Sequence, residues 1–487
     1  MKNIPRLSVD QIIRGSAETP AYDPANHQVG IVHLGPGAFH RAHQAVYTDT
    51  ALAAEGGDWR ITGVSLRSTD TADQLNPQNG LYTVLGRATS GTTARVIAAL
   101  DKVLVGPRDG DAILEAMETP QTRIVSLTVT EKAYGINRRT YRADLDHPAV
   151  NADLMTPQTP TGVLGFITEA LRRRRANGVA PFTVLSCDNL PENGKLLHSG
   201  VLDFARRIDP DLSDWIEKEV AFPSTMVDRI TPASTQETYD DAHALTGCRD
   251  LAAVETEPFS QWVIEDRFTS GRPAWEAGGA IFVKDVQPYE LMKLRMLNGA
   301  HSMLAYLGVM MGCTYVRDVM ARPELAQLVE RHIGAAQATL PKLAGVDLDE
   351  YRHELMARFA NRAIAHRTGQ IAMDGTEKLP QRIFSPACDA LQMGSDISPF
   401  AFSVAVWMFF CASNGGSCGG LNDPRVNEIT QCLQTATSPQ QISDALHGLP
   451  GLFPEMLKQS SDWRQAVTSN LKDLLDTNLA LTDPSTA

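Results

Sequence analysis

The sequence has no paired cysteines, no hydrophobic run of membrane length and no excess of basic residues. Its seven cysteines are odd in number and scattered without a CxxC pair, so we expect reduced thiols rather than a disulfide framework or a zinc site. The most apolar run, residues 399–412, is shorter than the roughly 20 residues of a membrane helix, and it predicts a buried core helix. The start, MKNIPRLSVD, lacks the basic and apolar regions of a secretory signal. We therefore expect a cytoplasmic protein with no membrane partner.

The charge balance is acidic, with 57 Asp and Glu against 44 Lys and Arg and a net charge of −13. This argues against nucleic acid or an anionic membrane as the main partner. It does not exclude a small anionic substrate, because a local cationic pocket can exist in an acidic protein. With 487 residues, of which 43% are hydrophobic, the chain can form two or three domains around a large core.

The first half of the chain alternates short apolar runs with helical segments. After a polar arm at 1–27, we predict strands at residues 29–34, 59–66, 124–130 and 181–188, a hairpin at 81–86 and 95–100, and a helix at 162–178. Strands that alternate with helices of 10–17 residues indicate a doubly wound α/β sheet of the Rossmann type.

Beyond about residue 285 the strand signals almost vanish and helical periodicity dominates. Helices are predicted at 289–311, 324–340, 347–360, 399–412, 425–436, 440–447 and 463–477. We therefore predict an NAD-binding Rossmann-like domain at 1–285 and a mainly α-helical substrate and catalytic domain at 286–487. Ligand sites favour the carboxyl ends of sheet strands and the clefts between domains.

A glycine turn, Gly35-Pro-Gly37-Ala-Phe-His40, follows the first predicted strand. It has the first two glycines of GxGxxG, and His40 occupies the position of the third. Gly35 permits a tight turn and Gly37 allows the backbone to approach a pyrophosphate. By itself the motif fits a cofactor loop or an ordinary strand-to-helix turn. His40 and His43 have the spacing of metal ligands, but no carboxylate or Cys accompanies them, so we predict a structural or phosphate-side role and no metal.

An acidic residue is expected about 20 residues after such a turn, where it holds the adenosine ribose. Asp70 follows the second predicted strand, 35 residues after Gly35, which requires a longer helix and loop. Thr69 and Asp70, with no basic residue between them, favour NAD over NADP. Arg67 lies nearby and weakens this preference.

The helical segment that begins at Tyr289 carries three polar residues: Lys293, Asn298 and His301. At about 100° per residue they lie at roughly 0°, 140° and 80° around the axis, and so share one broad face. Such residues on an apolar helix are costly unless they meet partners or a substrate. A desolvated Lys can lose its proton, an amide can hold an oxygen, and an imidazole can donate or orient. A capped, partly exposed helix remains the alternative.

Together these segments resemble the mannitol dehydrogenase family of polyol-specific long-chain dehydrogenases. The matching segments are GPGAFHRAHQA (35–45), IVSLTVTE (124–131), SCDNLPENG (186–194), FPSTMVDRITP (222–232), QWVIEDRF (261–268) and MKLRMLNGAHS (292–302). They occur in family order and cover the chain from about residue 29 to 470. Within the family the resemblance is nearest to the fructuronate reductases, through MKLRMLNGAHS and HRTGQIAMDGTEKLPQRI (366–383).

The resemblance implies metal-free hydride transfer between NAD(H) and a secondary alcohol or ketone. It makes Lys293 the acid/base, joined by Asn298 and His301 of the same motif and by Asn189 of SCDN. Burial between the domains is expected to lower the pKa of the Lys, which is ordinarily about 10.4. The two Asn amides would donate to an alkoxide-like oxygen, and the nicotinamide is expected beside Thr130 and Asn189.

The other implied site residues fall into two sets. The cofactor set is Leu34, Gly35, Pro36, Gly37, Ala38, Phe39, His40, Arg41, Asp70 and Thr130. The substrate set is Asp228, Lys378 and Arg382. Three alternatives stay open: Asp228 could form a structural salt bridge with Arg229, Lys378 could be an exposed loop residue, and Glu290 could either tune Lys293 or be solvated.

Two positions bear on the substrate. At the positions of Gln370 and Arg382 the mannitol dehydrogenases have Arg and Lys, respectively. These two differences favour a sugar acid as the substrate. A uronate carboxylate needs a cation, for which Arg295, Lys378 and Arg382 are candidates. We expect interconversion of D-fructuronate and D-mannonate with NAD(H). The alternatives are a mannitol or arabinitol 2-dehydrogenase, a tagaturonate reductase, or a non-catalytic NAD-binding sensor; the oligomeric state is open.

Overall fold

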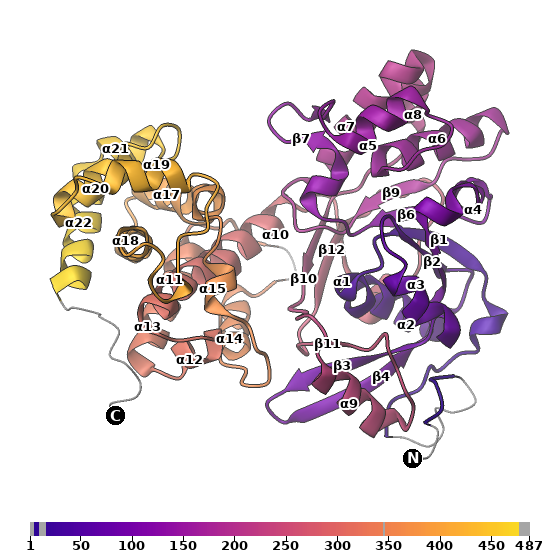
Figure 1. Cartoon of the computed structure of the whole chain (residues 1–487), viewed down its shortest axis with the longest axis horizontal. Helices are drawn as coiled ribbons and strands as arrows, with labels where there is room; N and C mark the ends of the chain where they lie inside the picture. Colours follow the sequence, from indigo (N-terminus) through magenta and orange to yellow (C-terminus); the bar gives the residue numbers. More distant parts are fainter. Residues whose placement is uncertain (1–3, 9–15, 344–345, 477–487) are drawn as a thin grey trace. The chain divides into compact units, whose positions relative to one another are not determined.

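The computed structural model describes residues 4–8, 16–343 and 346–476. It forms two compact units, Met1–Gln287 and Pro288–Ala487, and each is described by itself. The first is a parallel-sheet unit and the second is helical, so the predicted fold class is confirmed (Figure 1). Part of the predicted arm at 1–27 and residue 477 of the last predicted helix lie outside the described residues.

The centre of the first unit is a five-stranded parallel sheet of order β5-β2-β1-β6-β9. Its strands are β1 (Val29–Leu34), β2 (Arg60–Ser65), β5 (Leu100–Val105), β6 (Ile124–Leu127) and β9 (Thr183–Ser186). The strands predicted at the start, at 59–66, at 124–130 and at 181–188 are all present. Because β1 is central and β2 and β6 flank it, the turns that follow these three strands open at one edge of the sheet.

Both faces of this sheet are covered. Val32 and Val125 point into a core that contains residues of α4 (Gly106–Glu118), α6 (Val163–Ala176) and α7 (Asn193–Ile208). Ile31 and Ile124, their chain neighbours, point into a second core with α2 (Gln44–Glu55). Side chains of a strand alternate between faces, and burial on both faces explains the nearly continuous apolar runs of the sequence. Figure 1 shows these helices around the sheet.

Two three-stranded sheets and the two-stranded sheet β7-β8 also belong to the first unit. One three-stranded sheet has the order β11-β3-β4 and the other β10-β12-β13. Their strands are β3 (Tyr82–Ala88), β4 (Gly91–Ile97), β11 (Val254–Thr256), β10 (Thr225–Asp228), β12 (Gln261–Glu265) and β13 (Ile281–Val283). The β3–β4 pair is the predicted hairpin, but residues 95–100 do not form one strand. They are divided between β4 and β5, because Leu100 begins the ladder with β2.

The remaining elements of the first unit are short strands and surface helices. They are α1 (Ala38–Ala42), α3 (Asp70–Leu75), α5 (Pro148–Met155), α8 (Pro210–Glu219), α9 (Gln236–Thr246), β7 (Ile136–Asn137) and β8 (Arg142–Ala143). The helical segment after the glycine turn is broken at His43, whose backbone has φ −124° and ψ −96°. α1 and α2 are therefore two helices rather than one.

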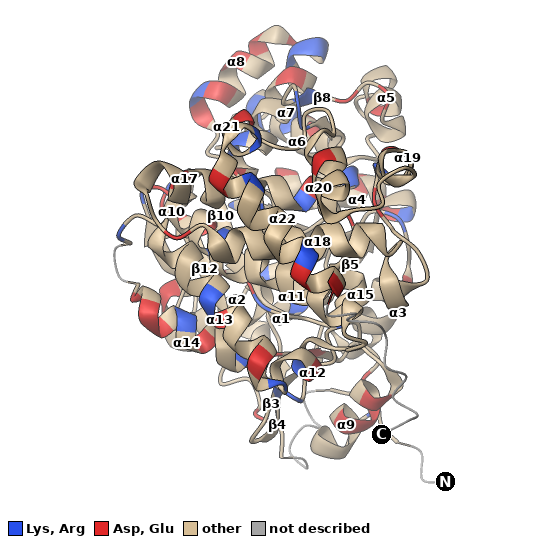
Figure 2. Ribbon diagram, turned by 90° about the vertical axis from the view of Figure 1, so that its left-hand side faces the viewer, with Lys and Arg blue, Asp and Glu red and all other residues tan. Residues whose placement is uncertain are grey.

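The second unit consists of helices packed around two uncharged ones, α11 (Gly299–Met310) and α18 (Ser398–Ala412). The others are α10 (Gln287–Met292), α12 (Val316–Met320), α13 (Pro323–Ala338), α14 (Leu348–Phe359), α15 (Thr368–Ile371), α16 (Gly375–Leu379), α17 (Ser385–Met393), α19 (Val426–Leu433), α20 (Pro439–His447), α21 (Glu455–Gln459) and α22 (Ser461–Asp476). Figure 2 shows charged residues on the outer helices such as α14. α18 is the predicted core helix, and among the described residues no helix is both long and apolar enough to span a membrane.

The helix predicted at 289–311 is continuous but not uniform. Residues Lys293–Asn298 form a π-helical segment, η6, between α10 and α11, and the N–H of Gly299 donates to the carbonyl of Leu294, five residues earlier. A second π segment, η7 (Pro380–Phe384), lies between α16 and α17. π segments are rare and occur often at functional sites.

Candidate active site

The glycine turn begins where β1 ends. Gly35 has φ +87°, and a Cβ there would lie 2.2 Å from the carbonyl oxygen of Thr128, so only glycine fits. The N–H of Gly37 donates to the carbonyl of Gly35 at 2.7 Å. A Cβ on Gly37, by contrast, would have no protein atom closer than 3.9 Å.

The open space at Gly37 fits a dinucleotide. Since contacts within the chain do not require glycine at this exposed position, the missing side chain leaves the backbone accessible to a ligand. Gly37 is also the N-cap of α1, where backbone N–H groups are unpaired and favour an anion. Leu34 and Pro36 are buried and support the turn from below, while Ala38 and Phe39 are partly exposed.

Two predicted cofactor residues point inward. His40 is fully buried, and its ring stacks on that of His33 with centroids 3.5 Å apart. The guanidinium of Arg41 is also buried and donates to the carbonyls of Ala252 and Gly37. Of the two roles predicted for the His40 side chain, structural or phosphate-side, the structure supports the structural one, because the ring fills the space between β1 and α1. Arg41 holds the turn from inside.

The ends of β6 and β9 are joined by a carboxyl group that the sequence did not single out. Oδ2 of Asp188 accepts the N–H of Val129 at 3.0 Å and the hydroxyl of Tyr134 at 2.6 Å. Burial raises the pKa of Asp188 to about 7, against the lowering effect of these two donors. The predicted nicotinamide neighbours Thr130 and Asn189 are exposed and adjoin these bonded residues, so Asp188 fixes the loops that carry them.

The remaining predicted residues of the first unit lie on three other segments. Asp70 is exposed and begins α3, after β2. Asp228 is buried at the end of β10. Arg229, offered as its structural partner, donates instead to the carbonyls of Ala42 and Glu257. Arg229 therefore ties α1 to the strand region, and its hydrogen bonds do not depend on Asp228.

In the second unit the three polar residues of the Lys293 helix are buried. Lys293, Asn298 and His301 are 7%, 8% and 7% exposed, so the alternative of a partly exposed helix is wrong. In a regular α-helix Asn298 would lie about 140° from Lys293 around the axis. The i to i+5 hydrogen bonding of a π turn brings residues five apart closer to one line. η6 thus gathers the two side chains more closely than the sequence pattern indicated.

His301 has basic neighbours. Its ring is 5.1 Å from that of His366 in an edge-on arrangement and 4.6 Å from that of Phe359. Burial lowers the pKa of His301 well below its usual value, and His366, Arg358, Arg382 and Lys293 lower it further. Its Nε2 is buried and has no hydrogen-bond partner among the described protein atoms. A neutral imidazole in this position can meet a ligand oxygen.

The two predicted substrate cations of this unit are partly buried. Arg382, on η7, donates to the hydroxyl of Ser302 at 3.1 Å and to the carbonyl of Asn298 at 3.4 Å. Burial lowers its pKa to about 10. Lys378 donates to the carbonyls of Ile371 and Met373, and burial, followed by Arg382, lowers its pKa. Lys378 is therefore not the exposed loop residue of the alternative.

Arg295 is excluded as a carboxylate ligand by its own bonds. It is 5% exposed, forms an ion pair with Asp389 at 2.6 Å and donates to the carbonyl and hydroxyl of Thr339. The sequence offered Arg295 as a candidate cation for the substrate, but its guanidinium is buried and paired with protein groups. Arg295 joins η6 to the end of α13 and to α17.

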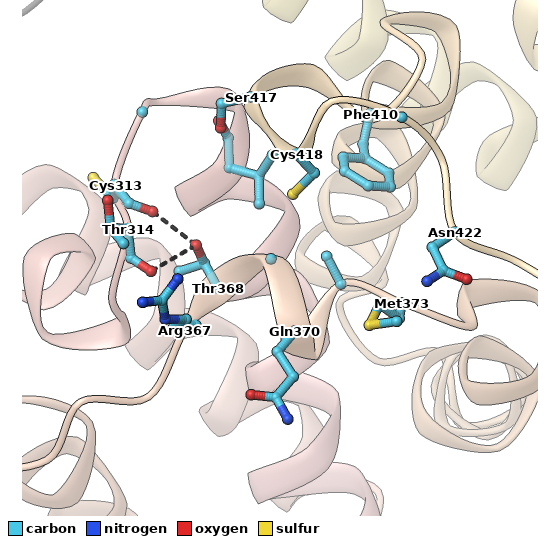
Figure 3. A pocket seen from close by; sticks show the side chains of 15 residues that line it. Cys313, Thr314, Arg367, Thr368, Gln370, Met373, Phe410, Ser417, Cys418 and Asn422 are labelled. Atoms are coloured by element: carbon cyan, nitrogen blue, oxygen red, sulfur yellow. Dashed lines mark hydrogen bonds between the residues drawn. The ribbon is translucent and has the colours of Figure 1, made fainter. Parts of the chain in front are cut away.

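Gln370 lines a cavity of about 480 Å³ near the C-terminal end of α11. Figure 3 shows this cavity with Thr368 turned toward Cys313 and Thr314, whose carbonyls accept its hydroxyl. Its lining does not include Lys293, Asn298 or His301. The seven cysteines are free, and no group of three or more His, Cys, Asp or Glu in the described chain could hold a metal.

Several residues that shape these sites were not predicted from the sequence. His33, Thr128 and Asp188 support the loops of the first unit, and Arg358 and His366 surround His301. For His33 a signal existed, because a His within the apolar strand VGIVHL needs a partner. Arg358 and His366 are far from the Lys293 motif in sequence, and only the fold brings them together.

A glycine turn on a parallel sheet, with a separate helical unit carrying Lys, Asn and His in one helix, defines a nicotinamide-dependent dehydrogenase. The chain matches the mannitol dehydrogenase Rossmann domain over residues 29–277 and the mannitol dehydrogenase C-terminal domain over residues 285–475. It therefore belongs to the mannitol dehydrogenase family, and it is an oxidoreductase that uses NAD.

Individual relatives extend over nearly the whole chain. D-mannonate oxidoreductase of Escherichia coli K12 is 42% identical over 94% of this chain and 95% of its own. An uncharacterized oxidoreductase of the same organism is 43% identical over 92% of each chain. The structure is similar to that of Pseudomonas fluorescens mannitol 2-dehydrogenase in complex with NAD and D-mannitol, with TM-score 0.83, 35% identity and coverage of 97% and 98%.

Proposed function

We propose that this protein interconverts D-fructuronate and D-mannonate with NAD(H). The observation that carries the proposal is the basic character of the surroundings of His301. The ring of His366 lies 5.1 Å from that of His301, and the basic groups Arg358, Arg382 and Lys293 also lower the pKa of His301. Such a setting favours a carboxylate ligand, whereas a neutral polyol gains little from it. The relative that acts on mannonate supports the same substrate class.

Lys293 is the proposed acid/base. During reduction it gives a proton to the carbonyl oxygen of the substrate, and during oxidation it takes the proton back from the hydroxyl. When bound, NAD(H) would supply or accept the hydride at the carbon that carries this oxygen. The amide of Asn298 donates to the oxygen as negative charge develops on it; Asn298 and Lys293 both belong to the π segment η6.

His301 and Arg382 are the proposed contacts of the sugar acid. The unpartnered Nε2 of His301 suits a substrate hydroxyl. The guanidinium of Arg382 has one nitrogen engaged by Ser302 and Asn298, and its other donors suit the two oxygens of a carboxylate. Lys378 holds two backbone carbonyls and adds positive charge near Arg382.

The first unit contributes the proposed cofactor contacts. The backbone at Gly37 and Ala38 receives the pyrophosphate, Asp70 receives the adenosine ribose, and Thr130 lies beside the nicotinamide. Asn189 and Asp228 keep the roles that the resemblance gives them, an amide donor and a substrate ligand. Leu34, Gly35, Pro36 and Phe39 shape the turn. We propose a two-domain division close to that predicted from the sequence, with the cofactor on the first domain and the substrate chemistry on the second.

The test is a comparison of sugars. Purified protein is assayed for NADH oxidation with D-fructuronate, tagaturonate and D-fructose. We expect kcat/KM for fructuronate to exceed that for fructose by about 10–100-fold, since a good charged contact contributes about 1.5–3 kcal/mol. Equal or higher activity with fructose would defeat the proposal and favour a mannitol or arabinitol dehydrogenase. Preference for tagaturonate would retain a uronate reductase but change the epimer.

A further inference from the structure

A chain of buried polar groups runs beneath the glycine turn. The His33 ring on β1 has Nδ1 2.8 Å from Oγ of Ser126 and Nε2 2.8 Å from Oγ1 of Thr128. Thr128 donates its hydroxyl to the carbonyl of Gly35 at 2.8 Å. At the other end, Oγ of Ser126 lies 3.0 Å from Oε1 of the Gln44 amide on α2, while Nε2 of the same amide has no hydrogen-bond partner among the described protein atoms. The chain therefore links the first helix pair to the turn through one imidazole.

The number of protons fixes the direction of this chain. A hydroxyl has one hydrogen, and Thr128 gives its hydrogen to Gly35. It must therefore accept from His33, so the proton of the neutral ring is on Nε2. Nδ1 is then an acceptor, and Ser126 must donate to it. Ser126 in turn must accept from Gln44, which requires the Gln44 amide to be assigned with its NH₂ toward the serine, in place of the Oε1 that faces the serine in the structure.

The surroundings keep His33 neutral. The ring is fully buried and burial lowers its pKa to about 3. It lies against the ring of His40, nearly parallel at 16°, and the pKa of His40 is lowered well below its usual value by burial and then by His33. Two stacked imidazoles in an apolar setting cannot both be charged, and a neutral His33 that bridges two hydroxyls donates to one of them and accepts from the other.

The end of the chain is the carbonyl of Gly35. This oxygen accepts both the hydroxyl of Thr128 and the N–H of Gly37. It is the hinge of a turn whose first residue has a positive φ that glycine adopts as readily as a negative one. Glycine alone leaves the orientation of this peptide free, and the hydroxyl of Thr128 selects one orientation.

We propose that Gln44, Ser126, His33 and Thr128 form a one-way hydrogen-bond chain that fixes the Gly35 carbonyl and so presents the Gly37 backbone to the dinucleotide. Within this chain His33 and Thr128 are positioning residues. Their effect falls on cofactor affinity, because ordering a flexible turn in advance lowers the cost of binding. The inference concerns NAD and does not depend on the choice of sugar.

The main test compares isosteric substitutions of two threonines, one directly after β6 and one within β2. Thr128→Val removes the hydroxyl, and Thr128→Ser keeps it. Thr62→Val is the matched control, because Thr62 is buried in β2 of the same sheet. We expect Thr128→Val to raise the Kd for NADH about 10-fold, corresponding to about 1.4 kcal/mol. The turnover at saturating NADH and the KM for the sugar should change less than about 2-fold, and Thr128→Ser should restore affinity.

Two results would overturn the proposal. One is a Kd for Thr128→Val that equals that of the unchanged protein or of Thr62→Val. The other comes from ¹⁵N NMR of the histidine rings in the unchanged protein, where we expect His33 to carry its proton on Nε2. A proton on Nδ1 contradicts the direction of the chain, and this measurement does not require any variant to fold.

Discussion

The glycine turn and the Lys293 helix are both short motifs, but their geometry has different origins. The turn depends on residues whose conformation is dictated locally, since only glycine fits at φ +87° against Thr128. The position of Asn298 relative to Lys293 depends on a π segment that no residue of η6 announces. A local backbone requirement can be recognised in a sequence, whereas a helical register is set by what packs around the helix.

The two regions also use their basic residues differently. In the first unit Arg41 and Arg229 turn inward and hold backbone carbonyls. In the second unit Arg295 is used in the same structural way, but Arg382 and the groups around His301 form a basic set. The comparison predicts that changes in the first unit alter cofactor affinity or stability, and that changes near His301 alter turnover or substrate choice.

The largest effect is expected for Lys293→Ala. Loss of the proton carrier should reduce turnover about 10²–10⁴-fold, while the Kd for NADH stays within about 2-fold. Steady-state assays and NADH fluorescence titration measure the two quantities. Lys284→Ala is the matched control, because that side chain is exposed. If neither the parent protein nor Lys293→Ala turns over the substrate while both bind NADH tightly, the result supports a non-catalytic sensor instead.

Arg382→Met should alter substrate choice. We expect kcat/KM for fructuronate to fall about 10–100-fold, because a charged hydrogen bond is lost, while activity on fructose falls much less. Arg295→Met is the contrasting variant. Its partner Asp389 is 38% exposed, so we expect the melting temperature to fall by a few degrees with no change in the ratio of the two sugars. If Arg295→Met instead changes the ratio of the activities on fructuronate and fructose, Arg295 rather than Arg382 is the residue that binds the carboxylate.

The two glycines of the turn should separate stability from binding. Gly35→Ala places a Cβ 2.2 Å from the carbonyl oxygen of Thr128 at a positive φ, so thermal unfolding should show a large loss of stability. Gly37→Ala meets no protein atom closer than 3.9 Å, and its stability should change by less than about 0.5 kcal/mol. Its Kd for NADH should nevertheless rise about 10-fold. Unaltered NADH affinity of Gly37→Ala would place the cofactor elsewhere.

The smallest expected effect is a pH dependence due to Asp188. Its pKa is raised from 3.8 to about 7, so the folded state binds a proton that the unfolded state has lost. The contribution of this group to stability is full below pH about 4 and is lost as the pH rises through about 7. Asp188→Asn should remove this trend. Melting temperatures of both proteins across pH 4–8 measure the difference, and parallel curves contradict the assignment.

Much of the first unit could be predicted because its signals are local. The strand-turn-helix pattern located β1, the glycine turn and β2, and the apolar runs located β6 and β9. The break at His43 could not be foreseen, because it results from a ring that packs on Phe39 and Trp262. The inward rings of His33 and His40 likewise depend on the strand that comes to lie beside β1.

In the second unit the resemblance supplied the residues and the structure supplied their surroundings. The sequence named Lys293, Asn298 and His301, but it could not show that Arg295 is held by Asp389. It could not place Arg358 and His366 beside His301 either. These relations join segments that are more than 50 residues apart, and no periodicity encodes them.

η6 also has a consequence for how the helix tolerates changes in length. A π turn contains one residue more than an α turn, so deleting Leu294 would let ordinary α geometry run from α10 into α11 without breaking the helix. In the shortened helix the Asn would follow the Lys by four residues, about 40° away around the axis, so Lys293 would keep nearly its direction relative to His301. A single-codon deletion at Leu294 is thus expected to leave a folded protein whose amine still shares a face with the Asn and His.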